Sequence, residues 1–280
     1  MVVIPAGTFD MGIVPGEGET DSDEVPQHSV RIEKAFAVGV HEVTRGQFEQ
    51  FVRATGYDAG DECQVHAPDG WKKVQGASWR NPGFDQTPKH PVVCVSWLDA
   101  QAYVEWLSRQ TRGAYRLLSE AEWEYIAGAD TRISDVSIMT HDKANYGEEK
   151  CCGPKTEGND RWEYTAPVGS FKANSFALYD VRGNVWEWLQ DCYHEDYRGA
   201  PTDGTARTSG CSHADRRALR GGSWGDPASS LRPAYRLRGS LDGRYFTLGF
   251  RIARDLTGMK AGLPRSFHGR AALPSTIRRA

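Results

Sequence analysis

Apolar side chains recur at helical spacing in three segments of the chain, and a helix-capping signal precedes each segment. The shared helical faces carry Phe48, Phe51 and Val52 in the first segment, Tyr103, Trp106 and Leu107 in the second, and Trp123 and Ile126 in the third. Thr44, Ser96 and Ser119 stand before these faces, each followed three residues later by an acid or amide that can bind a free backbone N–H. The pattern predicts three helices whose aromatic side chains lie in the core.

Shorter apolar runs between turn-rich stretches predict strands. These runs cover residues 30–32, 37–40, 185–188, 218–220 and 248–252. The polar stretches 55–90, 130–165 and 192–217 are predicted to be long loops. So much irregular backbone needs side chains, water or ions as hydrogen-bonding or ligand partners, which favours a bound metal as a structural element.

The chain shows neither an internal repeat nor a linker that would divide it. One domain is therefore predicted from residue 1 to about residue 256. Residues 257–280 contain five Lys or Arg residues and no acid, so they are predicted to form a basic C-terminal tail.

The composition is that of a globular protein, with 39% hydrophobic and 25% charged residues among 280. A formal net charge of −3 gives no field that would attract nucleic acid or an anionic membrane, so neither is expected as a partner. The chain has no apolar run of about 18 residues and no basic-then-apolar leader. A cytoplasmic location is weakly favoured, although a chain trimmed at its N-terminus would look the same.

The six cysteines lack the two-residue spacing of a zinc site. Cys63 and Cys94 flank one loop, and Cys192 and Cys211 flank another. The sequence leaves two interpretations open: two disulfides formed in an oxidising compartment, or free thiols.

Six sequence blocks occur in a fixed order over residues 3–255. They are residues 4–12, 91–97, 116–125, 179–188, 220–224 and 249–251. This ordered set resembles the formylglycine-generating enzyme, or sulfatase-modifying factor, superfamily. The resemblance implies an α+β fold related to C-type lectins, with low regular secondary structure, a few helices and short antiparallel strands. It also implies structural calcium.

The resemblance places one calcium on the segment from Asp180 to Glu187. The implied ligands are Asp180, the carbonyl groups of Gly183 and Val185, and Glu187, a set of oxygens that suits a hard cation. The alternative is that Asp180 and Glu187 only cap turns or pair with arginine. A second implied calcium site, on a looser match, consists of Asn145, Tyr146, Asp160 and Trp162.

The sequence departs from the enzyme where that enzyme holds copper(I) between two cysteine thiolates. Those two positions fall on Asp226 and Leu231, and copper(I) needs soft thiolate ligands, so copper is not expected. Trp186 and Ser223 match residues near that active site and are predicted to shape a pocket.

The segment from Ser223 to Phe250 resembles the diversified region of variable proteins from diversity-generating retroelements, which share this fold. Its predicted ligand-binding residues are Trp224, Gly225, Asp226, Ser230, Tyr235, Leu237, Arg238, Asp242, Tyr245, Phe246 and Thr247. Ordinary drift in a surface loop is the alternative.

The favoured function is therefore ligand binding, with a protein as the first candidate ligand and no catalytic residue assigned. The alternative is a metal- and oxygen-dependent oxidoreductase that acts on a cysteine, a thiol or a modified peptide. A regulatory or structural module is a third interpretation.

Overall fold

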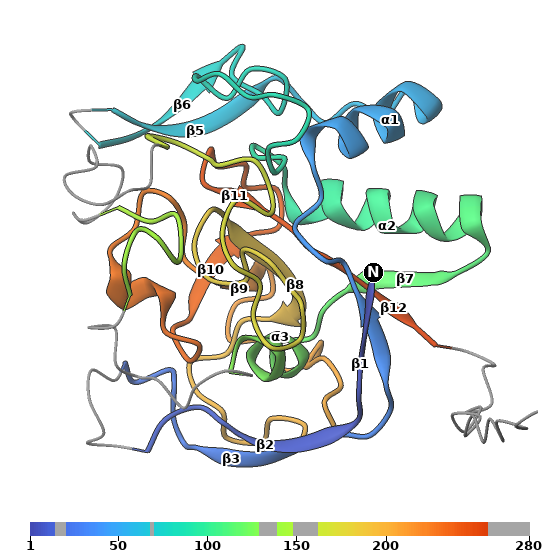
Figure 1. Cartoon of the computed structure of the whole chain (residues 1–280), viewed down its shortest axis with the longest axis vertical. Helices are drawn as coiled ribbons and strands as arrows, with labels where there is room; N and C mark the ends of the chain where they lie inside the picture. The colour runs from blue at the N-terminus through green and yellow to red at the C-terminus, as the bar shows by residue number, and fades with distance from the viewer. Residues whose placement is uncertain (15–20, 68–69, 129–138, 148–161, 257–280) are drawn as a thin grey trace, which may run out of the picture.

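The computed structural model describes residues 1–14, 21–67, 70–128, 139–147 and 162–256 (Figure 1). The predicted basic tail, residues 257–280, and Asp160 lie outside these residues. The helical elements are α1 (Arg45–Thr55), α2 (Trp97–Thr111), α3 (Glu120–Ala127) and the 3₁₀ helix η2 (Ala228–Leu231). The strands are β1 (Val2–Ile4), β2 (Gly7–Met11), β3 (His28–Ile32), β4 (Phe36–Val38), β5 (Glu62–Ala67), β6 (Gly70–Gln75), β7 (Ala114–Leu117), β8 (Trp186–Cys192), β9 (Arg216–Arg220), β10 (Leu237–Ser240), β11 (Leu248–Gly249) and β12 (Ile252–Asp255).

In the described part of the chain, the strands form two four-stranded sheets and two two-stranded sheets. One sheet has the order β1-β4-β12-β7 and is antiparallel throughout. The other has the order β10-β9-β8-β11, in which only β11 runs parallel to its neighbour β8. Strands β2 and β3 pair with each other, as do β5 and β6. The expected fold class, α+β with short and mainly antiparallel strands, is confirmed.

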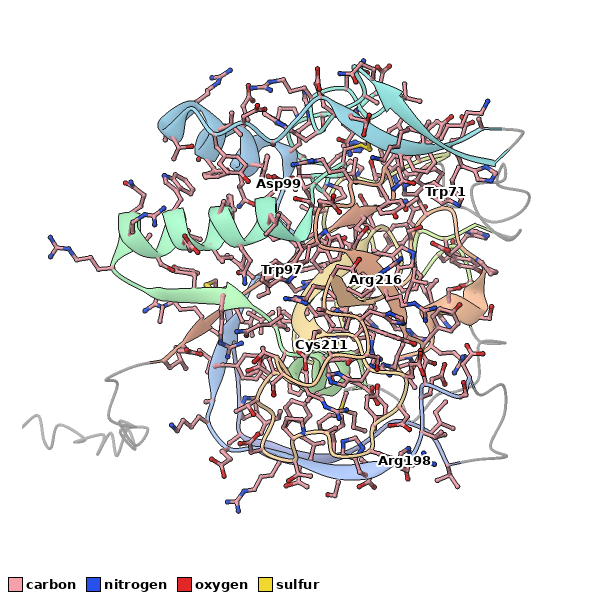
Figure 2. The ribbon with its side chains drawn as sticks, turned by 180° about the vertical axis from the view of Figure 1, so that it is seen from behind. Trp71, Trp97, Asp99, Arg198, Cys211 and Arg216 are labelled. Carbon is pink, nitrogen blue, oxygen red and sulfur yellow. A yellow bond between two sulfur atoms is a disulfide. The ribbon has the colours of Figure 1, made fainter. Side chains whose placement is uncertain are left out.

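The three helices begin at the residues that the capping signals predict. Thr44, Ser96 and Ser119 are the N-caps, and each forms a complete capping box with the residue three positions later. Asp99, in the first turn of α2 (Figure 2), also accepts hydrogen bonds from Arg244 at 2.8 and 3.0 Å. A local signal thus fixes the start of each helix, and in α2 the same side chain joins a distant segment.

The aromatic side chains lie in the core, as predicted. Phe48 of α1 packs against Tyr103 of α2 and against Trp79, and the same cluster extends to Trp188 of β8. Trp123 of α3 belongs to a second cluster under β2 and β3. Of the predicted helical faces, only Trp106 and Leu107 are half-buried rather than buried.

Two predicted segments differ from the structure. The predicted strand 248–252 is divided into β11 and β12, which belong to different sheets. The predicted loop 55–90 contains the β5–β6 hairpin, whose second strand is exposed at five of its six residues. A strand that buries neither face carries no apolar alternation, so the sequence pattern could not reveal it.

Both proposed cysteine pairs are disulfides, Cys63–Cys94 and Cys192–Cys211. The first joins β5 to the segment before α2, and the second anchors the loop that follows β8 (Cys211 is labelled in Figure 2). Within the described residues, every helix is too short or too polar to cross a membrane.

Candidate functional site

Asp226 lies in the turn between β9 and η2, where two hydrogen-bond donors from the sequence motifs converge on its carboxyl group. Trp186, the first residue of β8, donates its indole N–H to Asp226 Oδ2 at 2.8 Å. The Ser223 hydroxyl donates to the same oxygen. Ser223 and Trp186 are buried and Asp226 is half-buried. Burial raises the pKa of Asp226, although both hydrogen bonds oppose the rise.

The other position expected from the copper site, Leu231, is fully buried against Ala144 and Tyr146. The two positions therefore offer one carboxylate and one apolar side chain. Copper(I) prefers thiolate or thioether ligands, so this pair does not fit it. The chemistry available at the site is hydrogen bonding and proton exchange by Asp226.

A chain of contacts extends from Trp186, the partner of Asp226, through Tyr235 to a buried ion pair. The Tyr235 ring lies 6.0 Å from the Trp186 ring, and burial raises the pKa of Tyr235. The Arg232 guanidinium lies 5.4 Å from the Tyr235 ring and pairs with Glu24 through two bonds of 2.7 Å. Trp186, the predicted pocket-shaping residue, thus contacts both Asp226 and Tyr235.

The predicted ligand-binding residues differ widely in exposure. Trp224, Gly225, Ser230, Phe246 and Thr247 are buried; Asp226, Tyr235 and Tyr245 are half-buried; Leu237, Arg238 and Asp242 are exposed. Trp224 and Phe246 pack against each other at 5.0 Å in an aromatic cluster with Tyr164, so these two side chains face the interior. A macromolecular ligand could reach only the exposed and half-buried members.

The turn that carries the first implied calcium site has unusual backbone conformations. Asp180, Gly183 and Asn184 have positive φ values of 52°, 87° and 64°. A Cβ at Gly183 would collide with the carbonyl oxygen of Asn145, and that same oxygen accepts the Asn184 N–H at 2.8 Å. The turn is therefore held against Asn145, a residue that the sequence assigned to the second site.

Three buried carboxyl groups, Glu42, Asp180 and Glu187, share the single guanidinium of Arg251 in this region. Asp180 Oδ1 and Glu42 Oε2 are buried and have no hydrogen-bond partner among the described residues. Burial, with a smaller part from Glu187, raises the pKa of Asp180 to about 6. Burial and the neighbouring Asp180 raise the pKa of Glu42 well above its ordinary value. Orphaned oxygens and excess negative charge together fit a bound cation.

Glu187, one of the implied calcium ligands, is hydrogen-bonded to other side chains. Both of its oxygens are occupied: Arg251 Nε donates to Oε1 at 3.0 Å and the Trp123 indole N–H donates to Oε2 at 2.9 Å. The alternative that Glu187 pairs with arginine is what the structure shows. The carboxyl oxygens without a partner among the described residues belong to Asp180 and Glu42. The sequence analysis did not single out Glu42, whose other oxygen accepts a hydrogen bond from the Asn184 side chain at 3.0 Å. Val185 is buried in the same turn.

Of the second implied calcium site, Asn145, Tyr146 and Trp162 are described, and Asp160 lies outside the described residues. Asn145 is buried with an unpartnered Oδ1, and its Nδ2 donates to the Tyr164 carbonyl at 2.8 Å. Tyr146 stacks on His141 with ring centroids 4.0 Å apart. Trp162 lies against His90 at 5.8 Å. Asn145 is thus the member of this set that adjoins the Asp180 turn.

A further acidic group, Asp21, Asp23 and Glu24, was missed from the sequence. Its ligand atoms lie within 4.8 Å of one another. Glu24 is paired with Arg232, and Asp23 accepts the Tyr193 hydroxyl at 2.7 Å. These partners already satisfy the buried member of the group.

The sheets, the glycine-rich turn after β9 and the buried arginines define a lectin-like domain in which short strands support a polar site at one end of β8. The Sulfatase-modifying factor enzyme 1-like domain family model matches residues 1–256, and the chain belongs to this family. Formylglycine-generating enzyme from Streptomyces coelicolor is 33% identical over 91% of this chain and 88% of its own length. The Bos taurus enzyme is 34% identical over 91% of this chain and 74% of its own.

Solved structures agree with this family. PvdO from Pseudomonas aeruginosa is 33% identical, with a TM-score of 0.76 over 91% of this chain and 93% of that one. Treponema denticola variable protein 1 has a TM-score of 0.64 at 22% identity over 91% of this chain and 94% of that one, which shows the common fold.

Proposed function

We propose that this family member binds an organic ligand, or a peptide segment of a protein, beside Asp226 and exchanges a proton with it. The observation that carries the proposal is the Asp226 carboxyl group, half-buried and held by Trp186 and Ser223. A raised pKa makes this carboxyl group a better proton acceptor than an ordinary aspartate, and its protonated form can donate. Fixed partners orient it, so little ordering is needed when a ligand arrives.

The exposed remainder of the predicted face supports a ligand larger than the Asp226 site itself. Leu237 and Arg238 lie on β10, the outer strand of its sheet, and Arg238 stacks on Tyr193 at 4.8 Å. Together with Asp242 they offer an apolar, a cationic and an anionic contact. In this proposal a peptide lies over β10 and presents one side chain to Asp226. The proposal includes sequence diversification only at the exposed positions Leu237, Arg238 and Asp242.

Calcium is the structural cofactor in this proposal, and it would stabilise the turn that precedes β8. Asp180 and Glu42 would hold it through the carboxyl oxygens that lack other partners, with the carbonyl groups of Gly183 and Val185 as the remaining protein ligands. The ion would offset the buried negative charge and fix the start of β8, where Trp186 positions Asp226.

The first test is a fragment screen of the full chain by ligand-observed NMR, with small amides, phenols and thiols as probes. We expect some fragments to lose at least tenfold in affinity in Asp226→Asn, because the neutral amide cannot exchange a proton. Their affinity in the unsubstituted chain should change with pH at the raised pKa of Asp226. Asp242→Asn, an exposed change in the same segment, is the control. Fragments that bind equally to both variants at every pH would refute the proposal.

Oxidation is the second candidate function, favoured by the similarity of 33–34% to formylglycine-generating enzymes over nearly the whole domain. Oxygen consumption in the presence of a cysteine-containing peptide, and its absence with the serine counterpart, would support it. A bound redox metal would then have to use ligands other than Asp226 and Leu231.

A further inference from the structure

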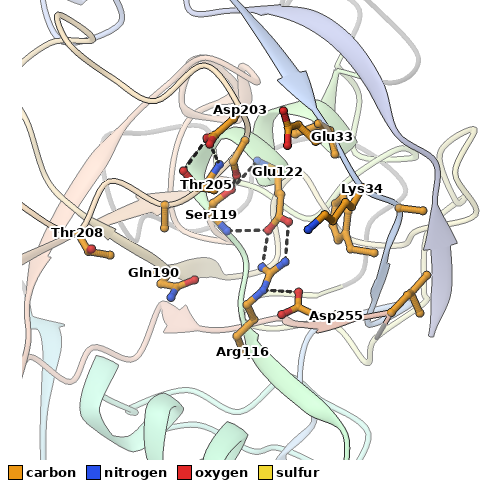
Figure 3. Close-up of a pocket in the computed structure, with 16 residues that line it drawn as sticks. Glu33, Lys34, Arg116, Ser119, Glu122, Gln190, Asp203, Thr205, Thr208 and Asp255 are labelled. Carbon is orange, nitrogen blue, oxygen red and sulfur yellow. Dashed lines mark hydrogen bonds and ion pairs between the residues drawn. The ribbon is translucent and has the colours of Figure 1, made fainter. Parts of the chain in front are cut away.

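A cavity lies apart from Asp226, on the side of the molecule where β3, β4 and β12 meet the N-terminus of α3 (Figure 3). Its volume is about 750 Å³, within the usual range of about 300–1,000 Å³ for small-molecule sites. Its wall includes Gln190 of β8, four residues beyond Trp186 and so roughly 13 Å along the strand. Asp226, Ser223 and Trp186 do not line it. A ligand could therefore occupy this cavity independently of the Asp226 site.

The arginine in this cavity is already neutralised. Arg116 donates to both oxygens of Glu122 at 2.6 and 2.7 Å, and its Nε donates to Asp255 at 2.9 Å. Figure 3 shows the guanidinium between these two carboxylates. The guanidinium charge is thus balanced by Glu122 and Asp255, so Arg116 offers little to an anionic ligand.

The N-terminus of α3 is also occupied. The Glu120 N–H is bound by Asp191 at 2.7 Å, and the Glu122 N–H is bound by the Ser119 hydroxyl at 3.0 Å. The Glu122 carboxylate closes the capping box on the Ser119 N–H. The positive end of the helix dipole is therefore compensated by the protein itself and does not select an anion.

Carboxylates without cationic partners remain at the rim. Glu33 and Asp203 are exposed and line the cavity, and neither is in an ion pair among the described residues. Thr205 donates its hydroxyl and N–H to Asp203 and lowers the pKa of that carboxyl, which keeps it charged. Lys34 is the one cavity cation in the described chain outside the Arg116 network. The half-buried Ala35, Ala206 and Leu256 give the cavity an apolar wall.

We propose that this cavity binds an organic cation: an ammonium or guanidinium group on a short carbon chain. The cationic group pairs with Glu33 and Asp203, and the carbon chain lies along the apolar wall. The Gln190 side chain, which is half-buried and has no hydrogen-bond partner in the described part of the chain, supplies a polar contact inside. The paired charges at the rim give specificity for positive ligands, and the apolar wall adds affinity.

The test uses agmatine as the probe, with the full chain and isothermal titration calorimetry at low salt. We expect agmatine to bind, and 1,4-butanediol, which has the same carbon chain without charge, to show no binding at the same concentration. The double variant Glu33→Gln/Asp203→Asn should bind agmatine at least tenfold more weakly. Glu105→Gln, an exposed carboxylate on α2, is the matched control and should bind unchanged.

A second variant tests the cavity itself rather than its charge. Ala206→Trp places a bulky side chain on the loop that lines the cavity, and it should weaken agmatine binding while the Asp226 fragment signals persist. The proposal is overturned if agmatine does not bind the full chain, if the double variant and Glu105→Gln bind alike, or if Ala206→Trp binds as well as the unsubstituted chain. Loss of the Asp226 fragment signals alone would refute only the proposed function.

Discussion

The Glu120 cluster and the Glu42 cluster are both groups of buried carboxylates around arginine, but only the first has a matching number of opposite charges. In the Glu120 cluster, Arg220 pairs with Glu120 and Glu124 at 2.9 and 2.8 Å, and Arg236 pairs with Glu120 at 2.7 Å. Burial alone would raise the pKa of Glu120, but Arg236 and Arg220 outweigh it and lower the value to about 2.

The Glu42 cluster comprises Glu42, Asp180, Glu187 and Arg251. Here the pKa values of the carboxyl groups shift in the opposite direction. Burial raises the pKa of all three carboxyl groups, and one guanidinium is too little to offset it. Buried charge is tolerated when it is paired and hydrogen-bonded, and otherwise it is neutralised by a proton or by an ion. The comparison indicates that the charges of the first cluster are balanced within the protein, whereas those of the second are not, and the proposed calcium ion would balance them.

The largest expected effect is on the balanced cluster. Glu120→Gln leaves Arg236 without its carboxylate partner and should lower the free energy of unfolding by about 3–5 kcal/mol, the usual result of breaking a buried ion pair. Urea unfolding followed by tryptophan fluorescence measures it. Glu105→Gln, on the exposed face of α2, should change the same quantity by less than about 0.5 kcal/mol. Equal effects of the two substitutions would show that the cluster does not stabilise the fold.

The next effect comes from the unbalanced cluster. Calcium at about 100 times its Kd should raise the free energy of unfolding by about 2.7 kcal/mol, and chelation should remove that gain. Asp180→Asn should abolish the response to calcium. In the presence of chelator the same substitution should be neutral or stabilising, because it removes one uncompensated buried charge.

Thermal melts of both chains with calcium and with chelator measure these four states. A melting temperature of the unsubstituted chain that is indifferent to chelation would argue against the calcium site. An equal destabilisation by Asp180→Asn in all conditions would assign Asp180 to turn geometry instead.

The smallest effect concerns the pH profile of the balanced cluster. The stability contributed by ionised Glu120 is complete above its unfolded-state pKa of about 4.3 and is lost as pH falls toward its folded value of about 2. Asp191 has the opposite sign: burial and Glu120 raise its pKa to about 7, so its contribution is complete below about pH 4 and is lost as pH rises through 7.

Urea unfolding between pH 2 and 8 should therefore show a shallower acid decline in Glu120→Gln than in the unsubstituted chain. The decline between pH 4 and 7 from Asp191 should also be smaller in this variant, since part of the pKa shift of Asp191 comes from Glu120. Parallel profiles of the two chains would show that other groups determine the pH dependence.

Features that depend on residues close together in the sequence could be predicted, whereas those that depend on distant residues could not. Helix starts were predictable because Thr44, Ser96 and Ser119 act on N–H groups three residues away. Asp180 could be named as a candidate calcium ligand because it lies in the same sequence motif as the turn that it belongs to. Glu42 was not, because only the fold brings it to Asn184.

Exposure along residues 223–250 could not be predicted for a different reason. A resemblance to a diversified segment does not say which way each side chain points, so Trp224 and Phe246, which face the aromatic cluster, were grouped with the exposed Arg238. Burial in this segment depends on Tyr164 and Phe84, from loops with no apolar period of their own. Trp186 and Ser223, the partners of Asp226, could be named from the sequence because they belong to two of its motifs.

The position of β12 has a consequence for how the chain reaches its folded form. This strand is inserted between β4 and β7, while β1 lies on the other side of β4, so the first sheet has its last-made strand in an inner position. A nascent chain that has emerged only as far as Phe250 leaves β4 and β7 each with an open edge able to pair with other chains. Completion of the sheet must therefore wait for the end of the domain, and prematurely terminated products should be aggregation-prone rather than partly functional.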